Sequence, residues 1–301
     1  MSMRKLALGI DLGGTNLRSG LVNPEGELIT FLSQPIDTQF SGDQIVEAVV
    51  EQVIGLGPLS GVSGVGVGLA ASILSGGILQ RGLTTLAGLA DYPFLERLSR
   101  ALSLPCLMDN DSILNLLGEV HYGAARGVDN VLLITLGTGI GSGLMLDGVI
   151  RRGAHSSGSE IGLTVVRDNI TGDYVPIEHM VSPGALTQKL GEPAGQLFQF
   201  ASEGDEKAKS LIDEMFEYLG LMVTDAHLLL DLELVLLSGG LARVGSVLRD
   251  GVRAAFTRAC PADYQFGLRI ELGDLPVEAA GVIGAACLWF EREGWLIRRR
   301  V

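Results

Sequence analysis

Two stretches of the chain place glycine and threonine directly after an apolar run, and in one of them an aspartate stands beside the glycines. The residues concerned are Asp11, Gly13, Gly14, Thr15 and Asn16 in GIDLGGTN, and Gly137, Thr138 and Gly139 in LGTGIG. A glycine-rich loop can turn several backbone N–H groups toward one point, and such a concavity binds phosphate oxygens. The sequence therefore predicts two phosphate-binding loops.

Neither stretch has the pattern of the commonest phosphate loops. A Walker A loop needs a Gly-Lys pair, and the chain contains none. A dinucleotide-binding loop needs G-x-G-x-x-G at the start of a helix, whereas NLRSGLV after the first loop has the character of a strand and ends at Asn23-Pro24. We interpret both stretches as the loops of β-hairpins that hold phosphate between them, one hairpin from each domain.

Asp11 needs a cation if a polyphosphate lies beside it, because two anions repel each other. Mg²⁺ is commonly held by one or two carboxylates together with phosphate oxygens and water. Asp11 is thus predicted to bind Mg²⁺, either directly or through a water molecule. The alternative is an aspartate that only stabilises a turn.

Phosphoryl transfer also needs a group that orients the acceptor hydroxyl and takes its proton. The best candidate lies in LMDNDSILNLLGE, where Asp111 stands between an apolar strand and a helix expected to begin with Ser112. An aspartate at such a place is often only the N-cap of the helix. Asp109 and Asn110 could supply the same cap, so capping alone does not explain Asp111.

The elements that must position these residues alternate between strands and helices along the chain. Strands are expected over 6–10, 16–22, 64–70, in 131–150 and over the apolar run IGLTVV after Glu160, and helices over 43–54, 91–102 and 206–230. Residues 8–28 and 132–150 also look like a degenerate internal repeat of strand, loop, strand, turn and strand. With 301 residues, of which 47% are hydrophobic, the chain can form two domains. We predict a duplicated α/β architecture that binds ligands where strands end in loops.

Composition excludes several classes of function. The net charge is −13 and the chain has only four lysines, which argues against nucleic acid as a partner. No window approaches the ~18 apolar residues of a membrane span, and the apolar run before Asp11 is too short for a signal peptide. We therefore expect a cytoplasmic protein without a membrane partner. The scattered Cys106, Cys260 and Cys287 are interpreted as buried thiols.

Four motifs, in this order and at this spacing, resemble the ROK family of sugar kinases from about residue 6 to residue 290. They are DLGGTN, DNDSILNLLGE, LGTGIGSGLMLDGVIRRGAHSSGSEIG and LVLLSGGLARVG. The resemblance implies the two-domain ribonuclease-H-like fold of the actin-like ATPases, an α/β fold with a duplicated mixed sheet, flanking helices and a cleft between domains. The implied N-terminal lobe is 1–119, joined by the C-terminal helix 285–301, and the implied C-terminal lobe is 120–284.

The resemblance also implies an activity, the transfer of the γ-phosphoryl group of ATP to a hydroxyl of a hexose. Asp111 falls on the family's general base. Asn110 and Glu160 fall on residues that hydrogen-bond the sugar hydroxyls, and Glu178 matches another. A sugar offers only hydroxyls, so a pocket of carboxylates and amides suits it, and such a pocket rejects analogues that lack the matching hydroxyl.

The nucleotide side of the site is implied in the same way. Gly13, Gly14, Thr15 and Thr138 fall on phosphate-binding positions of the family, within the loops DLGGTN and LGTGIG. Gly239 and Gly240 fall on its adenosine side. ATP and Mg²⁺ are therefore the expected cofactors, and a homodimer is the expected assembly.

Several positions near the sugar depart from the family pattern. Leu163 stands where a histidine is usual, and the chain has no cysteine between Cys106 and Cys260, so we expect no structural zinc. The other departures are at Ala70, Ala71, Leu74 and Leu89. These changes favour a modified hexose or a cyclitol over plain glucose, and they leave open a catalytically weak or inactive sugar-binding homologue.

A regulator is the remaining alternative, because the family includes sugar-responsive repressors with a helix-turn-helix segment before the kinase-like core. Asp11 lies only ten residues from the first residue, so we expect no such segment here. The acidic charge argues in the same direction. The sugar, its phosphorylated hydroxyl and the choice between ATP and polyphosphate stay open at this point.

Overall fold

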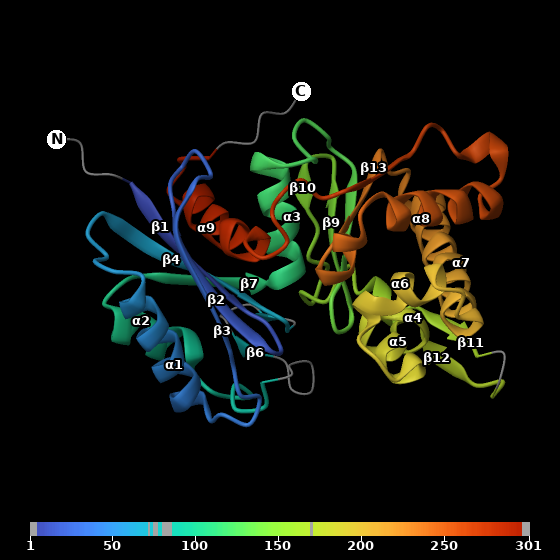
Figure 1. Ribbon diagram of the computed structural model, residues 1–301. Coiled ribbons are helices and arrows are strands. Elements are labelled where there is room, and N and C mark those ends of the chain that lie inside the picture. The colour runs from blue at the N-terminus through green and yellow to red at the C-terminus, as the bar shows by residue number, and fades with distance from the viewer. Residues whose placement is uncertain (1–4, 72, 75–77, 80–85, 169–170, 297–301) are drawn as a thin grey trace. The chain divides into compact units, whose positions relative to one another are not determined.

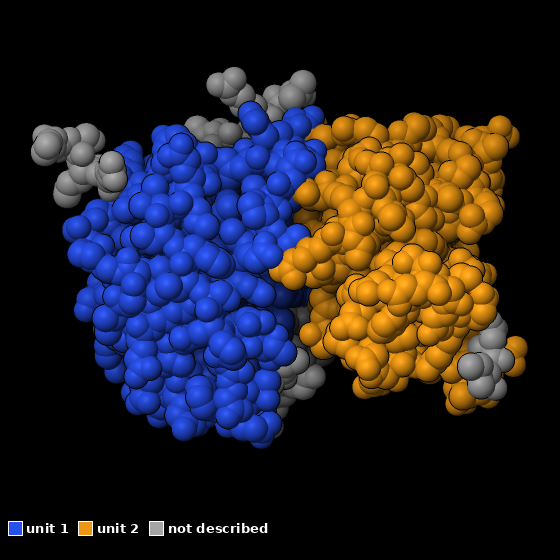
Figure 2. Space-filling model, viewed as in Figure 1, with its two compact units in different colours: residues 1–127, 152–158, 274–301 blue, residues 128–151, 159–273 orange. Residues whose placement is uncertain are grey.

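The computed structural model describes residues 5–296 apart from 72, 75–77, 80–85 and 169–170 (Figure 1). It divides into two compact units, coloured separately in Figure 2. Unit 1 comprises Met1–Gly127, Arg152–Gly158 and Asp274–Val301, and unit 2 comprises Val128–Arg151 and Ser159–Gly273. These limits differ from the lobes expected above, because the short segment 152–158 and the chain from Asp274 onward pack within unit 1.

Unit 1 is built on a five-stranded mixed sheet of order β3-β2-β1-β4-β7. Its strands are β1 (Leu6–Leu12), β2 (Asn16–Val22), β3 (Leu28–Pro35), β4 (Val62–Leu69) and β7 (Cys106–Asn110). The first three pair antiparallel, whereas β1, β4 and β7 are parallel neighbours. A separate small hairpin consists of β5 (Ile73–Leu74) and β6 (Ile78–Leu79).

Helices cover both faces of this sheet, as Figure 1 shows. They are α1 (Gly42–Gly55) and α2 (Phe94–Leu102) on one face, and α3 (Asp111–Tyr122) and α9 (Ala280–Arg292) on the other. Because side chains alternate along a strand, Leu8 of β1 joins the core under α1 and α2 while Ala7 packs with Val282 of α9. The α9 face is lined with glycine: a Cβ on Gly66 would lie 1.7 Å from the carbonyl oxygen of Ala285. Glycine at that position therefore allows helix and sheet to meet backbone to backbone.

Glu119 is a buried carboxylate near the end of α3, and its residue is only 1% exposed. Its Oε2 accepts the N–H of Ala124 at 2.8 Å and that of Asp274 at 3.1 Å, and its Oε1 accepts the N–H of Leu275 at 3.0 Å. Ala124 comes shortly before the chain leaves unit 1 after Gly127, and Asp274 is where it returns. One side chain thus fixes the departing and the returning segments on unit 1.

Unit 2 repeats the strand order of unit 1 in a second mixed sheet, β10-β9-β8-β13-β14. Its strands are β8 (Val131–Leu136), β9 (Ile140–Leu146), β10 (Val149–Ile150), β13 (Leu234–Ser238) and β14 (Arg269–Leu272). The first three pair antiparallel, and β8, β13 and β14 pair parallel. The shared order supports the internal repeat expected from the sequence.

The remaining elements of unit 2 are helices and one small hairpin. They are α4 (Glu178–Val181), α5 (Pro183–Leu190), α6 (Leu197–Ser202), α7 (Glu206–Leu230), α8 (Ser246–Ala259), β11 (Val165–Arg167), β12 (Tyr174–Pro176) and the 3₁₀ helices Ile161–Leu163, Ala194–Gln196, Gly240–Val244 and Ala262–Tyr264. Buried residues of α7 and α8, such as Leu219 and Val252, form the core with Val235 of β13. Within the described residues, no helix is long and apolar enough to cross a bilayer.

The predicted elements are confirmed at most places, and two predictions are wrong over part of their range. The apolar run IGLTVV was expected to be a strand, but it forms the 3₁₀ helix Ile161–Leu163 followed by β11. Gly162 explains the difference, because a Cβ there would lie 2.3 Å from the carbonyl oxygen of Ile140 and the backbone turns against β9 at that point. The C-terminal helix is present as α9, but it ends at Arg292, so the expected helix is wrong over residues 293–296, which form turns and bends. Residues 297–301 of the expected range lie outside the described residues.

Candidate functional site

The first glycine loop is the tip of the β1–β2 hairpin, as predicted. The N–H of Gly13 donates to the carbonyl oxygen of Asn16 at 3.0 Å, and the Asn16 amide donates to the hydroxyl of Thr15 at 2.9 Å. The N–H of Ile36, the residue after β3, donates to the carbonyl oxygen of Thr15 at 3.1 Å and so supports the loop from one side. Gly14 lies between these anchored residues, and Thr15 is exposed at the tip.

Asp11 lies at the base of this loop and is 8% exposed. Arg18, which faces it across the hairpin, donates from Nη1 to Oδ2 of Asp11 at 3.0 Å. Gly281 of α9 lies against the same carboxylate, since a Cβ there would be 2.7 Å from Cγ of Asp11. Burial raises the pKa of Asp11 above its usual range, and the ion pair with Arg18 acts in the opposite direction. A second cation near this carboxylate would further favour its ionised form.

Asp111 begins α3 directly after β7, and Asn110 is the N-cap of that helix. The Asn110 Oδ1 accepts the N–H of Ser112 at 2.9 Å and that of Ile113 at 3.1 Å. Its amide group donates to the carbonyl oxygen of Ala71 at 3.3 Å. Asn110 is therefore the N-cap of α3, so N-capping is not what accounts for an aspartate at position 111.

The carboxylate of Asp111 stays close to its own turn. Its Oδ1 accepts the N–H of Ser112 at 2.7 Å and the Ser112 hydroxyl at 3.3 Å. The helix start lies over β4, because a Cβ on Gly68 would be 3.6 Å from Cα of Asp111. Asp111 is half-buried, at the carboxyl end of a parallel strand. Such strand ends are the usual ligand-binding edge of an open α/β sheet.

The second glycine loop is the tip of the β8–β9 hairpin, also as predicted. The N–H of Gly137 donates to the carbonyl oxygen of Gly139 at 3.1 Å, and the N–H of Gly184 donates to that of Thr138 at 2.9 Å. Gly137 and Thr138 are exposed. In the described part of the chain, no atom lies within 4 Å of a Cβ built on Gly137. The loop therefore leaves open space where a phosphate group could approach its backbone.

Glu178 lies against this second loop. It is the first residue of α4, and its Oε2 accepts the N–H of Ile140 at 3.3 Å. A Cβ on Gly139 would be 2.8 Å from the same oxygen. The structure thus places this predicted sugar ligand beside the residues predicted to bind phosphate.

Glu160 is held near β9 through its neighbours. The Ser159 hydroxyl donates to the carbonyl oxygen of Ser142 at 3.3 Å, the Ser142 hydroxyl donates back to the carbonyl oxygen of Ser159, and the N–H of Ile161 donates to the Ser142 hydroxyl at 3.4 Å. Glu160 itself is half-buried and precedes the 3₁₀ helix that contains Leu163. Within unit 2, both predicted sugar-binding glutamates are therefore anchored beside β9.

The Gly239-Gly240 pair follows β13, the parallel neighbour of β8. Gly239 has φ of 86°, and a Cβ there would lie 2.7 Å from the backbone of Leu136, so a side chain would be excluded twice. Gly240 is exposed and opens the 3₁₀ helix Gly240–Val244. The pair lies beyond the carboxyl end of a strand, in the same position in the sheet as the ligand edge of unit 1.

Sequence reasoning missed two charged residues of the site, Arg18 and Arg152, and named Asp109 only as a possible helix cap. Arg18 could have been found from the hairpin register, which sets it opposite Asp11 across the loop 13–15. Arg152 and Asp109 form an ion pair beside Asn110, and their separation of 43 residues leaves no local signal. The two arginines therefore place positive charge beside Asp11 and beside the Asn110-Asp111 turn.

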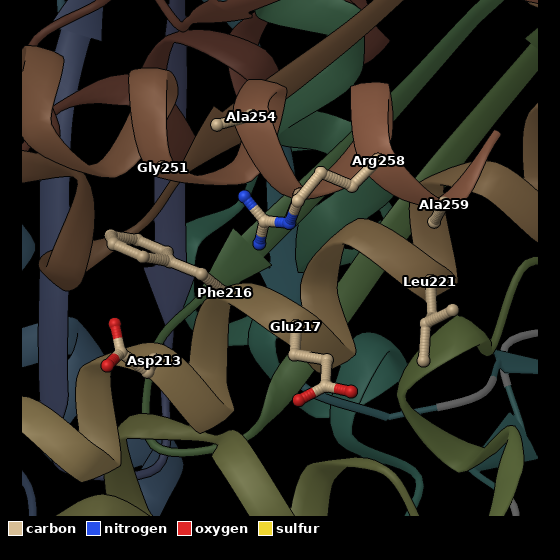
Figure 3. A pocket seen from close by; sticks show the side chains of 9 residues that line it. Asp213, Phe216, Glu217, Leu221, Gly251, Ala254, Arg258 and Ala259 are labelled. Atoms are coloured by element: carbon tan, nitrogen blue, oxygen red, sulfur yellow. The ribbon is translucent and has the colours of Figure 1, made fainter. Parts of the chain in front are cut away.

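A hollow in unit 2 lies away from these motifs. It has a volume of about 610 Å³ between α7 and α8 and is shown in Figure 3. Its described lining residues are Asp213, Phe216, Glu217, Leu221, Gly251, Ala254, Ala255, Arg258 and Ala259. None of them belongs to the predicted site, so this hollow and the glycine loops are separate features of unit 2.

Comparison with known proteins finds relatives along nearly the whole chain. The model of the ROK family matches residues 7–292. A glucokinase from Thermotoga maritima is 27% identical, over 97% of this chain and 100% of its own. An N-acetylmannosamine kinase from Yersinia pseudotuberculosis is 28% identical, over 94% of this chain and 97% of its own.

Solved structures share the fold. A ROK family glucokinase from Streptomyces griseus, in complex with glucose and AMPPNP, has a TM-score of 0.79 and 25% identity. The match covers 94% of this chain and 98% of that chain. The predicted fold class, an actin-like ATPase fold with two mixed sheets flanked by helices, is confirmed.

Proposed function

Because the chain belongs to the ROK family, we propose that it is a glucokinase-like sugar kinase that transfers the γ-phosphoryl group of ATP to a hydroxyl of a hexose-like sugar. Its relatives include a glucokinase and an N-acetylmannosamine kinase. The observation that carries the proposal is the turn after β7, where Asn110 is the N-cap of α3 and the carboxylate of Asp111 stands at the carboxyl end of a parallel strand, the usual ligand edge of such a sheet.

Asp111 is the proposed general base. A carboxylate that accepts the proton of the acceptor hydroxyl as the oxygen attacks phosphorus makes that oxygen a better nucleophile. The position of Asp111, at the start of a helix packed over Gly68, holds its backbone rigidly. The bonds from the N–H and the hydroxyl of Ser112 restrict the carboxylate further. This rigidity suits a group that must meet one hydroxyl at one angle.

The two glycine loops are the proposed phosphate-binding elements, and Gly239 and Gly240 the proposed adenosine side. The fit rests on the open space at Gly137 and at Gly240, where the backbone is exposed and no described atom would meet a Cβ. Asp11 would hold Mg²⁺, which when bound would neutralise part of the charge of the phosphate groups. Asp11 would act directly or through a water molecule, and its ion pair with Arg18 at Oδ2 orients the carboxylate.

The acceptor side would use Asn110, Glu160 and Glu178 to bind hydroxyls. Leu163, three residues after Glu160, is 44% exposed and apolar where the family pattern has a histidine. A leucine cannot pair with a hydroxyl, so this position favours a substrate that carries none there. A modified hexose or a cyclitol is therefore the second candidate substrate class, and an inactive sugar-binding homologue is the alternative function.

The test is a coupled ADP-release assay over hexoses, amino sugars and cyclitols, with ATP and polyphosphate as donors. We expect turnover with at least one sugar and ATP, and its loss in Asp111→Asn. Silence across the panel, together with sugar binding measured by calorimetry, would favour the inactive binder. Turnover with polyphosphate alone would overturn the choice of ATP.

A further inference from the structure

Arg152 and Asp109 form an ion pair next to the residues proposed to bind and deprotonate the acceptor. Both Nε and Nη2 of Arg152 donate to Oδ2 of Asp109, the first at 2.9 Å. Asp109 is 8% exposed, and its other oxygen, Oδ1, accepts the N–H of Asn110 at 2.9 Å. One carboxylate thus bridges the guanidinium group and the backbone of the turn that carries Asn110 and Asp111.

Arg152 is also the first residue of a short segment, 152–158, that belongs to unit 1 although its sequence neighbours on both sides belong to unit 2. The segment closes on itself, because the N–H of Gly158 donates to the carbonyl oxygen of Arg152 at 2.9 Å. Gly153, with φ of 75°, packs against Gly158 at the same closure. In the sequence, Glu160 follows two residues after this closure. The Arg152 side chain therefore ties the base of the loop to β7.

The ion pair reaches solvent on one side only. The Arg152 side chain is 41% exposed, so water screens its charge, whereas the Asp109 side chain is 11% exposed. The ion pair also has a geometric effect, because the guanidinium group contacts a buried carboxylate through two donors and fixes its orientation. Because the contact between Arg152 and Asp109 is partly exposed but strict in geometry, we expect its loss to affect the reaction at the Asn110-Asp111 turn more than the stability of the fold.

We propose that Arg152, acting through Asp109, is a positioning residue for phosphoryl transfer: it holds the Asn110-Asp111 turn and the loop 152–158 in one fixed arrangement. The proposal rests on the proposed function of Asp111. Lysine at this position would keep the charge but lose the two-donor contact, so it restores only part of the effect.

Arg151 offers a matched control, because it is the sequence neighbour of Arg152 and forms its own ion pair. Its Nη2 lies 3.3 Å from Oδ2 of Asp147, in an exposed turn of unit 2. Arg151→Gln and Asp147→Asn therefore each remove an Arg–Asp ion pair that lies away from the proposed site.

The experiment measures kinetics and amide hydrogen exchange in the full chain for Arg152→Gln, Arg152→Lys, Asp109→Asn, the double variant and the Arg151 control. We expect kcat/KM for the sugar to fall about 10²-fold in Arg152→Gln, with KM for ATP nearly unchanged. The double variant should be no worse than either single variant. Exchange at the N–H groups of Asn110 and Gly158 should accelerate in Arg152→Gln and stay unchanged in Arg151→Gln.

Three outcomes would overturn the proposal. They are wild-type kinetics in Arg152→Gln, equal losses in Arg151→Gln, and full additivity of the Arg152 and Asp109 effects. A wild-type protein without turnover would instead contradict the proposed function. In that case the exchange comparison still decides whether Arg152 holds the loop, because it needs no activity.

Discussion

Asn110 caps the helix that Asp111 begins, because its Oδ1 accepts hydrogen bonds from the N–H groups of Ser112 and Ile113. Two adjacent polar residues therefore have different tasks. One completes the helix terminus, while the other holds a carboxylate at the end of β7. The predicted catalytic and structural roles can be separated by substitution at this one turn.

Asp111→Asn should abolish most turnover and leave the fold intact. The loss of a general base lowers kcat by about 10²–10⁴-fold. Because Asn110 keeps the helix cap, the melting temperature should change little. Steady-state kinetics and calorimetric sugar binding check both statements, and a variant with wild-type kcat would remove Asp111 from the reaction.

Asn110 should respond differently to alanine and to serine. Asn110→Ala removes the N-cap and should destabilise the protein by about 1 kcal/mol in urea unfolding. Asn110→Ser keeps a capping oxygen and should unfold like the wild type, while it raises KM for the sugar because the amide group is lost. Equal sugar KM values in the wild type and the serine variant would exclude Asn110 from the acceptor pocket.

Gly137→Ala should impair nucleotide binding without harming the fold. An added methyl group meets no described atom within 4 Å, so unfolding should be unchanged. The methyl group would instead stand in the open space at the loop tip, and the loss of one charge-assisted hydrogen bond would raise KM for ATP about tenfold. Gly195→Ala, in the 3₁₀ helix Ala194–Gln196, is the control, since its Cβ also meets nothing. If Gly137→Ala has the same KM for ATP as the wild type and the Gly195→Ala control, the loop does not bind phosphate as proposed.

Glu119→Gln should destabilise the fold by about 2–3 kcal/mol, because one buried acceptor is replaced by a donor that faces backbone N–H groups. Oε2 accepts from both Ala124 and Asp274, so neither orientation of the amide satisfies all three donors. Urea unfolding gives the free energy, and exchange at the Ala124, Asp274 and Leu275 amides locates the change. Glu96→Gln, at an exposed ion pair, is the control and should unfold like the wild type.

Cys106 should resist alkylation in the native protein. Burial raises the pKa of its thiol to about 12, against about 8.5 for a free cysteine, so its thiolate at pH 8 is about 10³-fold rarer than in the unfolded chain. Because the folded pKa is the higher one, the stabilising contribution is complete below about pH 8.5 and is lost as the pH rises toward 12. Iodoacetamide labelling with peptide mapping, before and after urea, measures the ratio. Rapid native labelling of Cys106 would show that the thiol is accessible and ionised.

Much of the fold was predictable because its patterns are local. In SGVGVGL, glycine alternates with valine, which indicates a strand with one bulky face and one bare face. Gly66 indeed contacts Ala285 on the bare side, while Val65 and Val67 join the opposite core. The glycine loops could likewise be recognised as hairpin tips, since each lies between two short apolar runs.

The site's supporting contacts could not be predicted, because they join distant parts of the chain. Arg152 lies 43 residues from Asp109, and Glu119 lies 155 residues from Asp274. No spacing rule connects such residues before the fold is known. The wrong strand over IGLTVV has a similar cause, because the close approach of Gly162 to Ile140 outweighs the local β-propensity of the run.

The helix that closes unit 1 is made near the end of the chain, although the sheet it covers is made first (Figure 1). Until residues 280–292 have left the ribosome, α9 cannot pack on its face of the unit 1 sheet, and that part of the sheet stays exposed. The whole of unit 2, which ends at Gly273, is by then available to fold. During translation unit 2 can therefore complete its fold before unit 1 does. The exposed sheet of unit 1 is then the surface to which a chaperone would bind.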